Sequence, residues 1–262
     1  MLSRGLLCLL LSAAGGWPSC VQAQPAATGV PSASSPAPAP NPASVLSAHE
    51  AEILQQSLEI EDRDWMRPAE AAEKLSGLLQ ALDEGSPLRR ELLGMQGRMY
   101  ANADMKDAAE AVAAELEERQ RARADGSDLA AAMIRLRVKL MEGDGTVQIA
   151  ELRAMAARVD TELGARERMR FWFNLASGLG SHAEFGEAVE AFQTASDLAD
   201  ALGRPGWRST IRSAYASVLS QLGQHDRAVA MARDALELAK ELGDDTLLSE
   251  AYTTLGVVLD SS

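Results

Sequence analysis

Cysteine is almost absent from this sequence of 262 residues, and the only two, Cys8 and Cys20, lie near its start. The rest of the chain therefore has no disulfide framework, no thiol nucleophile and no cysteine metal site. Disulfides are dispensable at this length, because a chain of this size can bury enough apolar surface to fold without them.

Positive charge and aromatic side chains are also scarce. Lys and Arg number 25 against 38 Asp and Glu, so the net charge is −13, and Phe, Trp and Tyr make up 4% of the chain. A phosphate backbone or an anionic lipid surface would repel such a chain, which argues against nucleic acid or a membrane surface as a partner. An acidic surface of this kind keeps a protein soluble.

Long hydrophobic runs are missing apart from the start. The apolar run over residues 6–11 follows Arg4 and precedes Val21-Gln22-Ala23, an A-x-A-like cleavage site before Gln24. This order is typical of a secretory signal peptide, predicted over residues 1–23, and the run is too short to cross a bilayer. A buried N-terminal helix and a lipoprotein anchored at Cys20 are the alternatives, but the flanking residues fit them less well. We therefore expect an exported, periplasmic protein with no membrane span in this chain.

Proline is concentrated in one segment. Residues 24–43 hold six of the ten prolines and no charged residue, a composition typical of an extended, disordered tether. From residue 44 onward the chain is rich in Ala, Leu, Glu and Arg, which favour helices. Pro68, Pro87 and Pro205 stand where helical patterns resume, so we expect them at the first helical position.

The C-terminal part of the chain contains a repeat of forty residues. The first copy has Trp172, Leu175, Ala176, Leu179, Ala188, Phe192 and Ala195. The second copy has Arg212, Tyr215, Ala216, Leu219, Ala228, Ala232 and Ala235. The third copy has Tyr252, Leu255, Gly256 and Leu259. Small residues at the third position allow helices to approach closely. The glycines after leucine, Gly164, Gly203 and Gly243, are expected to end helices in the left-handed conformation.

The motif W-x-x-L-A-x-x-L followed by A-x-x-x-F-x-x-A resembles the tetratricopeptide repeat, in a variant of about 40 residues. The resemblance covers residues 166–262, where the last repeat is incomplete, and residues 44–165 contain degenerate helix pairs of the same kind. It implies an all-α fold, a right-handed α-solenoid of stacked antiparallel helix pairs with a concave groove. Five pairs and an unpaired last helix are expected. HEAT or armadillo repeats are the alternative, but they lack this arrangement of Trp, Leu and small residues.

The stretch KLMEGDGTVQIAEL over residues 139–152 resembles an EF-hand calcium loop, because five residues separate Asp144-Gly145 from Glu151. The first ligand position of such a loop would be Leu140, which offers no oxygen. The number of charged ligands sets the calcium affinity of these loops. We therefore predict a turn between two helices, without a metal.

No catalytic constellation is visible. The three histidines, His49, His182 and His225, lack the spacing of metal ligands, and the sequence has neither a G-x-S-x-G elbow nor a phosphate-binding P-loop. Acidic pairs in such helices are more typical of solvated faces than of acid–base catalysis. The sequence predicts no enzyme activity, no cofactor and no metal in residues 1–262.

The tetratricopeptide resemblance implies which side chains line the groove, because the first helix of each pair faces it in that family. The implied groove residues are Arg170, Phe173, Asn174, Ser177, Thr210, Ser213, Ser217, Glu250, Thr253 and Thr254. An Asn placed as Asn174 is often contacts a peptide backbone in the family, and the signature assigns Trp172 to the core, which leaves Phe173 exposed. The lysine-rich clamp for C-terminal carboxylates is missing, and only Arg170 resembles part of it. The alternative is that these are ordinary exposed polar residues.

Two functions follow from the resemblance. The first is an exported interaction scaffold that binds a protein or peptide in its groove; a small-molecule ligand is not indicated. The second is the N-terminal sensory region of a membrane-bound diguanylate cyclase, whose transmembrane helix and GGDEF domain are not in this chain. The apolar face of Tyr252, Leu255, Val258 and Leu259 has no following helix to cover it, so we expect the array to continue in a longer parent protein.

Overall fold

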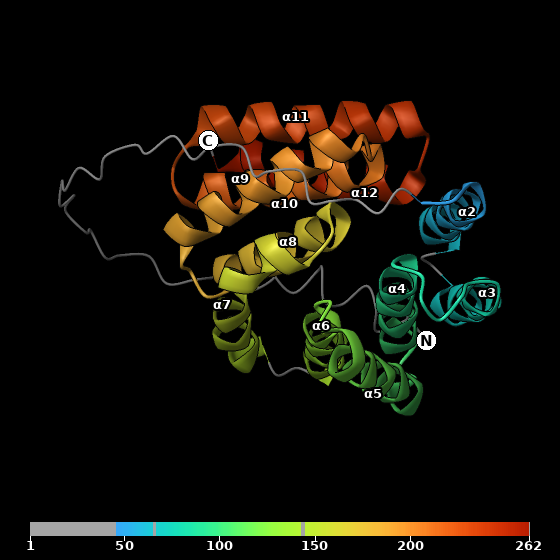
Figure 1. Cartoon of the computed structure of the whole chain (residues 1–262). Coiled ribbons are helices and arrows are strands. Elements are labelled where there is room, and N and C mark those ends of the chain that lie inside the picture. Colours follow the sequence, from blue (N-terminus) through green and yellow to red (C-terminus); the bar gives the residue numbers. More distant parts are fainter. Residues whose placement is uncertain (1–45, 65–66, 143–144, 262) are drawn as a thin grey trace. The chain divides into compact units, whose positions relative to one another are not determined.

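The computed structural model describes residues 46–64, 67–142 and 145–261. Within these ranges the chain forms eleven helices and no strand (Figure 1). The all-α prediction is confirmed. The predicted signal peptide and tether, residues 1–43, lie outside the described residues.

The helices recur at regular intervals along the chain. In order they are α2 (Ala48–Asp64), α3 (Pro68–Gln80), α4 (Leu88–Asn102), α5 (Lys106–Arg123), α6 (Ser127–Glu142), α7 (Gly145–Glu162), α8 (Ala165–Ser181), α9 (Phe185–Leu202), α10 (Pro205–Gln221), α11 (His225–Leu242) and α12 (Asp245–Asp260). We call the even-numbered helices first helices and the odd-numbered ones second helices. Each kind begins every 38 to 40 residues, from α2 to α12. The period that the sequence shows clearly only after residue 166 therefore governs the whole helical region.

Packing between the helices follows their order. Each second helix contacts the first helix before it and the first helix after it, from α2 through to α12. First helices also contact one another, α2 with α4, α4 with α6, α8 with α10 and α10 with α12. A helix that is apolar on one face only needs such neighbours to bury that face.

Local sequence signals explain several of the helix ends. Pro68 and Pro205 occupy the first turns of α3 and α10, as predicted, whereas Pro87 precedes the first residue of α4. The side chain of Asp244 accepts hydrogen bonds from two backbone N–H groups at the start of α12, at 2.9 and 3.0 Å. This is the usual way in which an aspartate caps a helix.

Two of the three predicted glycine caps are confirmed. Gly203 and Gly243 end α9 and α11 with φ of 61° and 64°, in the left-handed region. The prediction is wrong for Gly164, which has φ −69° and stands before α8, where its N–H donates to Glu167 at 3.0 Å. The sequence spacing is one residue off at this position, and the glycine begins the next helix instead of ending the previous one.

The largest core cluster runs from α6 to α12. Phe171, Phe192 and Tyr215 are fully buried in it, and the rings of Phe192 and Tyr215 stack with centroids 5.6 Å apart. Ala176 and Ala216 have no exposed surface. Their small side chains allow α8 and α10 to lie close to their neighbours, as the repeat pattern predicts.

Replacing Ala216 with leucine should therefore lower the free energy of unfolding by about 1–3 kcal/mol, because the added carbons find no space in a filled core. Ala176→Leu should have a similar effect. Ser177→Ala is the matched control, since Ser177 is only half-buried and its change should stay within about 0.5 kcal/mol. Urea denaturation measures all three, and equal stability of the three variants would contradict the assignment of these alanines to the helix contacts.

The stretch that resembles a calcium loop connects two helices. Residues 140–142 belong to α6 and residues 145–151 to α7, so an EF-hand loop of twelve residues has no room here. Lys139 pairs with Glu151, the residue that would close the loop, at 2.8 Å. Residues 143–144 lie outside the described residues, and in the described part no group of His, Cys, Asp and Glu side chains could hold a metal ion.

Candidate functional site

The predicted groove residues lie on α8, α10 and α12, but they do not share one level of exposure. Arg170 and Ser213 are buried, at 3% and 2% exposure. The half-buried ones are Phe173, Asn174, Ser177, Thr210, Glu250 and Thr254, and the exposed ones are Ser217 and Thr253. Ser213 is therefore part of the packed interior and offers no groove surface.

The aromatic triplet on α8 is arranged differently from the prediction. Phe171, not Trp172, is the fully buried ring. Trp172 is half-buried and its indole N–H donates to Asp160 at 3.2 Å. Phe173, expected to be exposed, packs edge-on against Phe192 and Trp207, with ring centroids 6.2 and 5.8 Å away. Successive helical residues point about 100° apart, so neighbouring helices decide which two of the three can find apolar surroundings.

Arg170 lies at the centre of a buried charged group. Its guanidinium donates a hydrogen bond to Glu61 of α2 and lies 5.6 Å from the ring centroid of Trp207. Only 4% of the Arg170 side chain and 8% of the Glu61 side chain are exposed. A cation over an indole ring is a favourable contact, and more so when it is desolvated.

Two further arginines converge on the same carboxylate. Arg98 of α4 lies 3.5 Å and Arg204, at the start of α10, lies 3.8 Å from an oxygen of Glu61. We call Arg98, Arg170 and Arg204 the arginine cluster. Three positive charges thus lie around Glu61 in an environment largely shielded from water, and the charges of Glu91 and Glu167 also act on Arg98.

The pKa shifts in the arginine cluster follow from burial and from the charges around it. Burial alone would raise the pKa of Glu61, but the charges of the three arginines outweigh it, so the pKa lies below its usual value. Burial, together with the charge of Arg170, lowers the pKa of Arg98 to about 10. Arg98 therefore remains charged at neutral pH.

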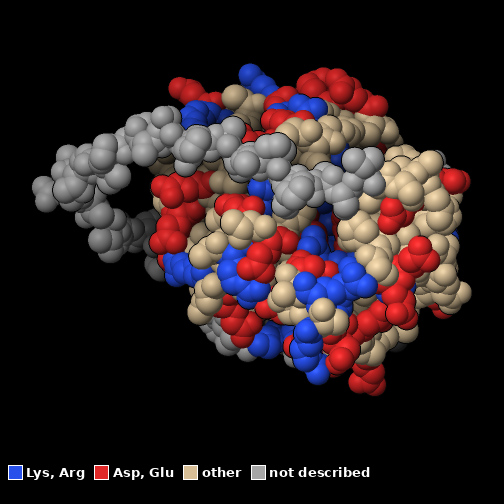
Figure 2. Space-filling view, viewed as in Figure 1, with Lys and Arg blue, Asp and Glu red and all other residues tan. Residues whose placement is uncertain are grey.

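Reciprocal ion pairs join α4 and α8 beside the arginine cluster. Arg90 lies 2.7 Å from Glu167, and Arg166 pairs with Glu91. The residues in each pair are more than 70 positions apart in the sequence. Figure 2 shows basic and acidic side chains interleaved over this part of the surface.

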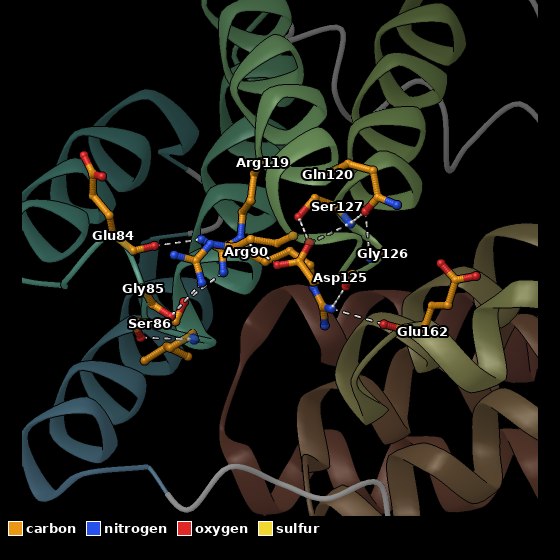
Figure 3. A network of polar contacts seen from close by, with 12 residues as sticks. Glu84, Gly85, Ser86, Arg90, Arg119, Gln120, Asp125, Gly126, Ser127 and Glu162 are labelled. Atoms are coloured by element: carbon orange, nitrogen blue, oxygen red, sulfur yellow. Dashed lines mark hydrogen bonds and ion pairs between the residues drawn. The ribbon is translucent and has the colours of Figure 1, made fainter.

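A network of polar contacts fixes the start of α4 and the loops near it (Figure 3). Arg119 donates to the backbone carbonyls of Glu84 and Ser86, both at 3.0 Å, and pairs with Asp125 at 2.8 Å. Buried backbone carbonyls need such donors. Arg119 thereby ties the loop before α4 to the loop before α6.

Arg90 extends this network to α7. Its guanidinium donates to the backbone carbonyls of Asp125 and of Glu162, the latter at 3.1 Å (Figure 3). Gly126 allows the loop before α6 to lie close to the end of α7, because a Cβ at this position would lie 2.9 Å from the carbonyl oxygen of Glu162. The φ of Gly126, +81°, also favours glycine. The contacts hold Arg90 in place and leave its other side facing Glu167 of α8.

This arrangement suits the binding of anions rather than catalysis. Guanidiniums bind carboxylate or phosphate oxygens through paired hydrogen bonds. Nε and Nη1 of Arg170 are buried and have no hydrogen-bond partner among the described residues. A buried donor without an acceptor is costly, so the site has more donors than Glu61 satisfies.

Sequence reasoning found only one member of this site. Arg170 was singled out through the family resemblance, but its partner Glu61 stands 109 residues earlier in the chain. Neither Arg98 nor Arg204 belongs to a recognisable motif. The signal that could have indicated the site is a four-residue spacing of polar groups, Arg166, Arg170 and Asn174, on one face of α8.

Comparisons with known proteins give no family for this chain. The sequence matches no protein-family model, and the curated proteins contain no match to it. None of the helices in the described ranges combines the length and the apolar character that crossing a bilayer requires.

Glu250 of α12, another predicted groove residue, carries a second electrostatic feature. Burial raises its pKa to about 7 from 4.5. The folded chain therefore holds this proton more tightly than the unfolded chain, and stability falls as the pH rises from about 4.5 to 7.

Glu250→Gln should consequently stabilise the protein by about 1–2 kcal/mol at pH 8, after allowance for the partial exposure of the side chain, and by almost nothing near pH 4.5. Glu241→Gln, an exposed change on α11, is the matched control and should show no such dependence on pH. Urea unfolding at the two pH values measures both. The same gain for Glu250→Gln at each pH would contradict a raised pKa.

Proposed function

We propose that this chain is an exported tetratricopeptide-like scaffold that binds a protein or peptide partner along the face shared by its first helices. The observation that carries the proposal is the convergence of charged residues from α2, α4, α8 and α10 on one place, around Arg170. The recurrence of helices every 38 to 40 residues supports a stacked array. Such arrays present a continuous surface formed by one helix of each repeat.

The charged residues buried along this face suggest the chemistry of the partner. The protein as a whole carries a net charge of −13, yet its first helices gather three arginines around a single glutamate. Complementary charge steers association and selects partners. We infer a partner that presents an acidic segment, and the export signal predicted over residues 1–23 makes the cell envelope the place to find it.

Asn174 provides the test of this function. It follows Arg170 by one helical turn on α8 and is half-buried, so it extends the same face without belonging to the ion pairs. Asn174→Ala should weaken binding of a partner recovered from the envelope fraction by at least about fivefold, or about 1 kcal/mol, while the melting temperature stays the same. Phe173→Ala does not serve, because Phe173 packs against Phe192 and Trp207.

The matched control is Gln193→Ala on α9, an exposed amide on a second helix. It should leave the affinity unchanged. Titration of the purified partner against wild type, Asn174→Ala and Gln193→Ala measures the three affinities. Binding that tolerates Asn174→Ala but is lost with Gln193→Ala would place the partner on the second helices and overturn the proposal.

A further inference from the structure

Helix α2 is lightly docked on the rest of the fold. Of residues 48–61, only Ile53, Ser57 and Glu61 are buried. They are spaced four residues apart and form one narrow stripe along the helix. By comparison, α9 buries six side chains. Burial of apolar area supplies most of the docking free energy of a helix, and α2 has little of it. Polar contacts therefore contribute to its docking: the buried ionic contacts of Glu61 and the hydrogen bond that Glu50 accepts from Ser86 at 2.6 Å.

Glu61 occupies the arginine cluster as a bound anion would. Its carboxylate accepts from Arg170 and lies within 3.8 Å of both Arg98 and Arg204. Nε and Nη1 of the buried Arg170 have no acceptor among the described residues, and Oε2 of Glu61 has no donor there, so Glu61 does not match the donors of Arg170. A carboxylate placed differently in the arginine cluster could therefore accept hydrogen bonds that Glu61 leaves unmade.

We propose that α2 is an internal ligand that occupies the arginine cluster until an acidic helix of the binding partner displaces it. This inference rests on the proposed function and names the chemistry of the partner segment: an acidic helix with a narrow buried stripe that carries a carboxylate to replace Glu61. The helix α2 has this composition, with six acidic residues and one arginine in the sequence AHEAEILQQSLEIEDRD. Displacement opens the face that continues from Arg170 toward Asn174.

Competition within the chain sets the size of the effect. A tethered segment acts at an effective concentration of roughly millimolar, so a partner must overcome that local competition. The apparent affinity of the partner equals its affinity for the open site multiplied by the fraction of molecules in which the site is open. Weakening the hold of Glu61 therefore strengthens the binding of an external acidic helix without changing the site itself.

The test uses the full chain and a labelled synthetic peptide with the sequence of residues 48–64 as the probe. Glu61→Gln in the protein should bind this peptide at least about tenfold more tightly than wild type, because the tethered competitor is weakened. Glu52→Gln, an exposed change on the same helix, is the matched control and should behave as wild type. The Glu61→Gln protein should not bind a peptide that itself carries Glu61→Gln more tightly than wild type does. The double variant Glu61→Gln, Arg170→Met should likewise not bind the unchanged peptide more tightly than wild type.

A peptide affinity that is equal for Glu61→Gln and wild type overturns the proposal. If Glu61→Gln does not fold, hydrogen exchange of the wild-type protein decides: α2 amides must exchange through local opening, faster than those of α4 and α8. Exchange of α2 only through global unfolding overturns the displacement of α2. A partner that binds through Asn174 while α2 stays protected would refute this inference and leave the proposed function intact.

Discussion

Replacing Arg170 with methionine is expected to lower the free energy of unfolding by about 3 kcal/mol. Methionine keeps the apolar stem but removes the guanidinium from beside Glu61 and from the ring of Trp207. Breaking a buried ion pair from one side costs about 3–5 kcal/mol, because the remaining charge stays buried. Arg98 and Arg204 still face Glu61, so the loss should lie at the low end of that range.

Arg212→Met on α10 is the matched control. Arg212 pairs with Asp200 and Asp234, whose side chains are 41% and 52% exposed. Pairs with such exposed partners contribute about 0–1 kcal/mol. Urea denaturation of both variants gives the comparison, and equal losses would show that burial of the Arg170 pair has no energetic consequence.

The dependence on pH provides an independent check on the Arg170 pair. The pKa of Glu61 lies below its usual value in the folded chain, so the pair stabilises the protein above the unfolded pKa of about 4.5 and this stabilisation is lost as the pH falls through the folded pKa. The difference between wild type and Arg170→Met should therefore shrink on acidification. A difference that grows at low pH would contradict the pairing.

Phe171→Ala is expected to lower the free energy of unfolding by about 3–5 kcal/mol, since it removes a fully buried ring and leaves a cavity. Phe171 lies in the core cluster that joins α6 to α12 and contacts Trp172 edge-on, with centroids 5.3 Å apart. The surrounding side chains belong to several helices, so they can collapse into the space only in part.

Trp172→Ala is the matched control for this prediction. Trp172 is half-buried, and its indole N–H donates to the exposed Asp160. We expect a smaller loss, about 1–2 kcal/mol, in line with the partial area removed from water. Chemical denaturation of both variants ranks the two rings. A larger loss for Trp172→Ala would restore the assignment that the repeat signature makes and would contradict the packing of α8 described above.

The regular features of the helical region could be predicted from the sequence by itself. Helix formers without strand signals dictate an all-α chain, and Pro68, Pro205, Gly203 and Gly243 mark helix ends because their backbone preferences act locally. The buried Ala216 marks a close contact between helices because its small side chain allows a neighbouring helix to approach. These are properties of a few consecutive residues, and they need no knowledge of the rest of the fold.

Only the tertiary structure decided which side chains meet. The helical period places Phe171, Trp172 and Phe173 about 100° apart but does not say which direction faces apolar neighbours. The packing of the helices around α8 determines which of the three rings are buried. Ser213 fits an exposed position by residue type and is buried. Glu61 and Arg170 are 109 residues apart, and their contact arises only when α2, α4, α8 and α10 pack together, because charge pairing at a distance leaves no local pattern in a sequence.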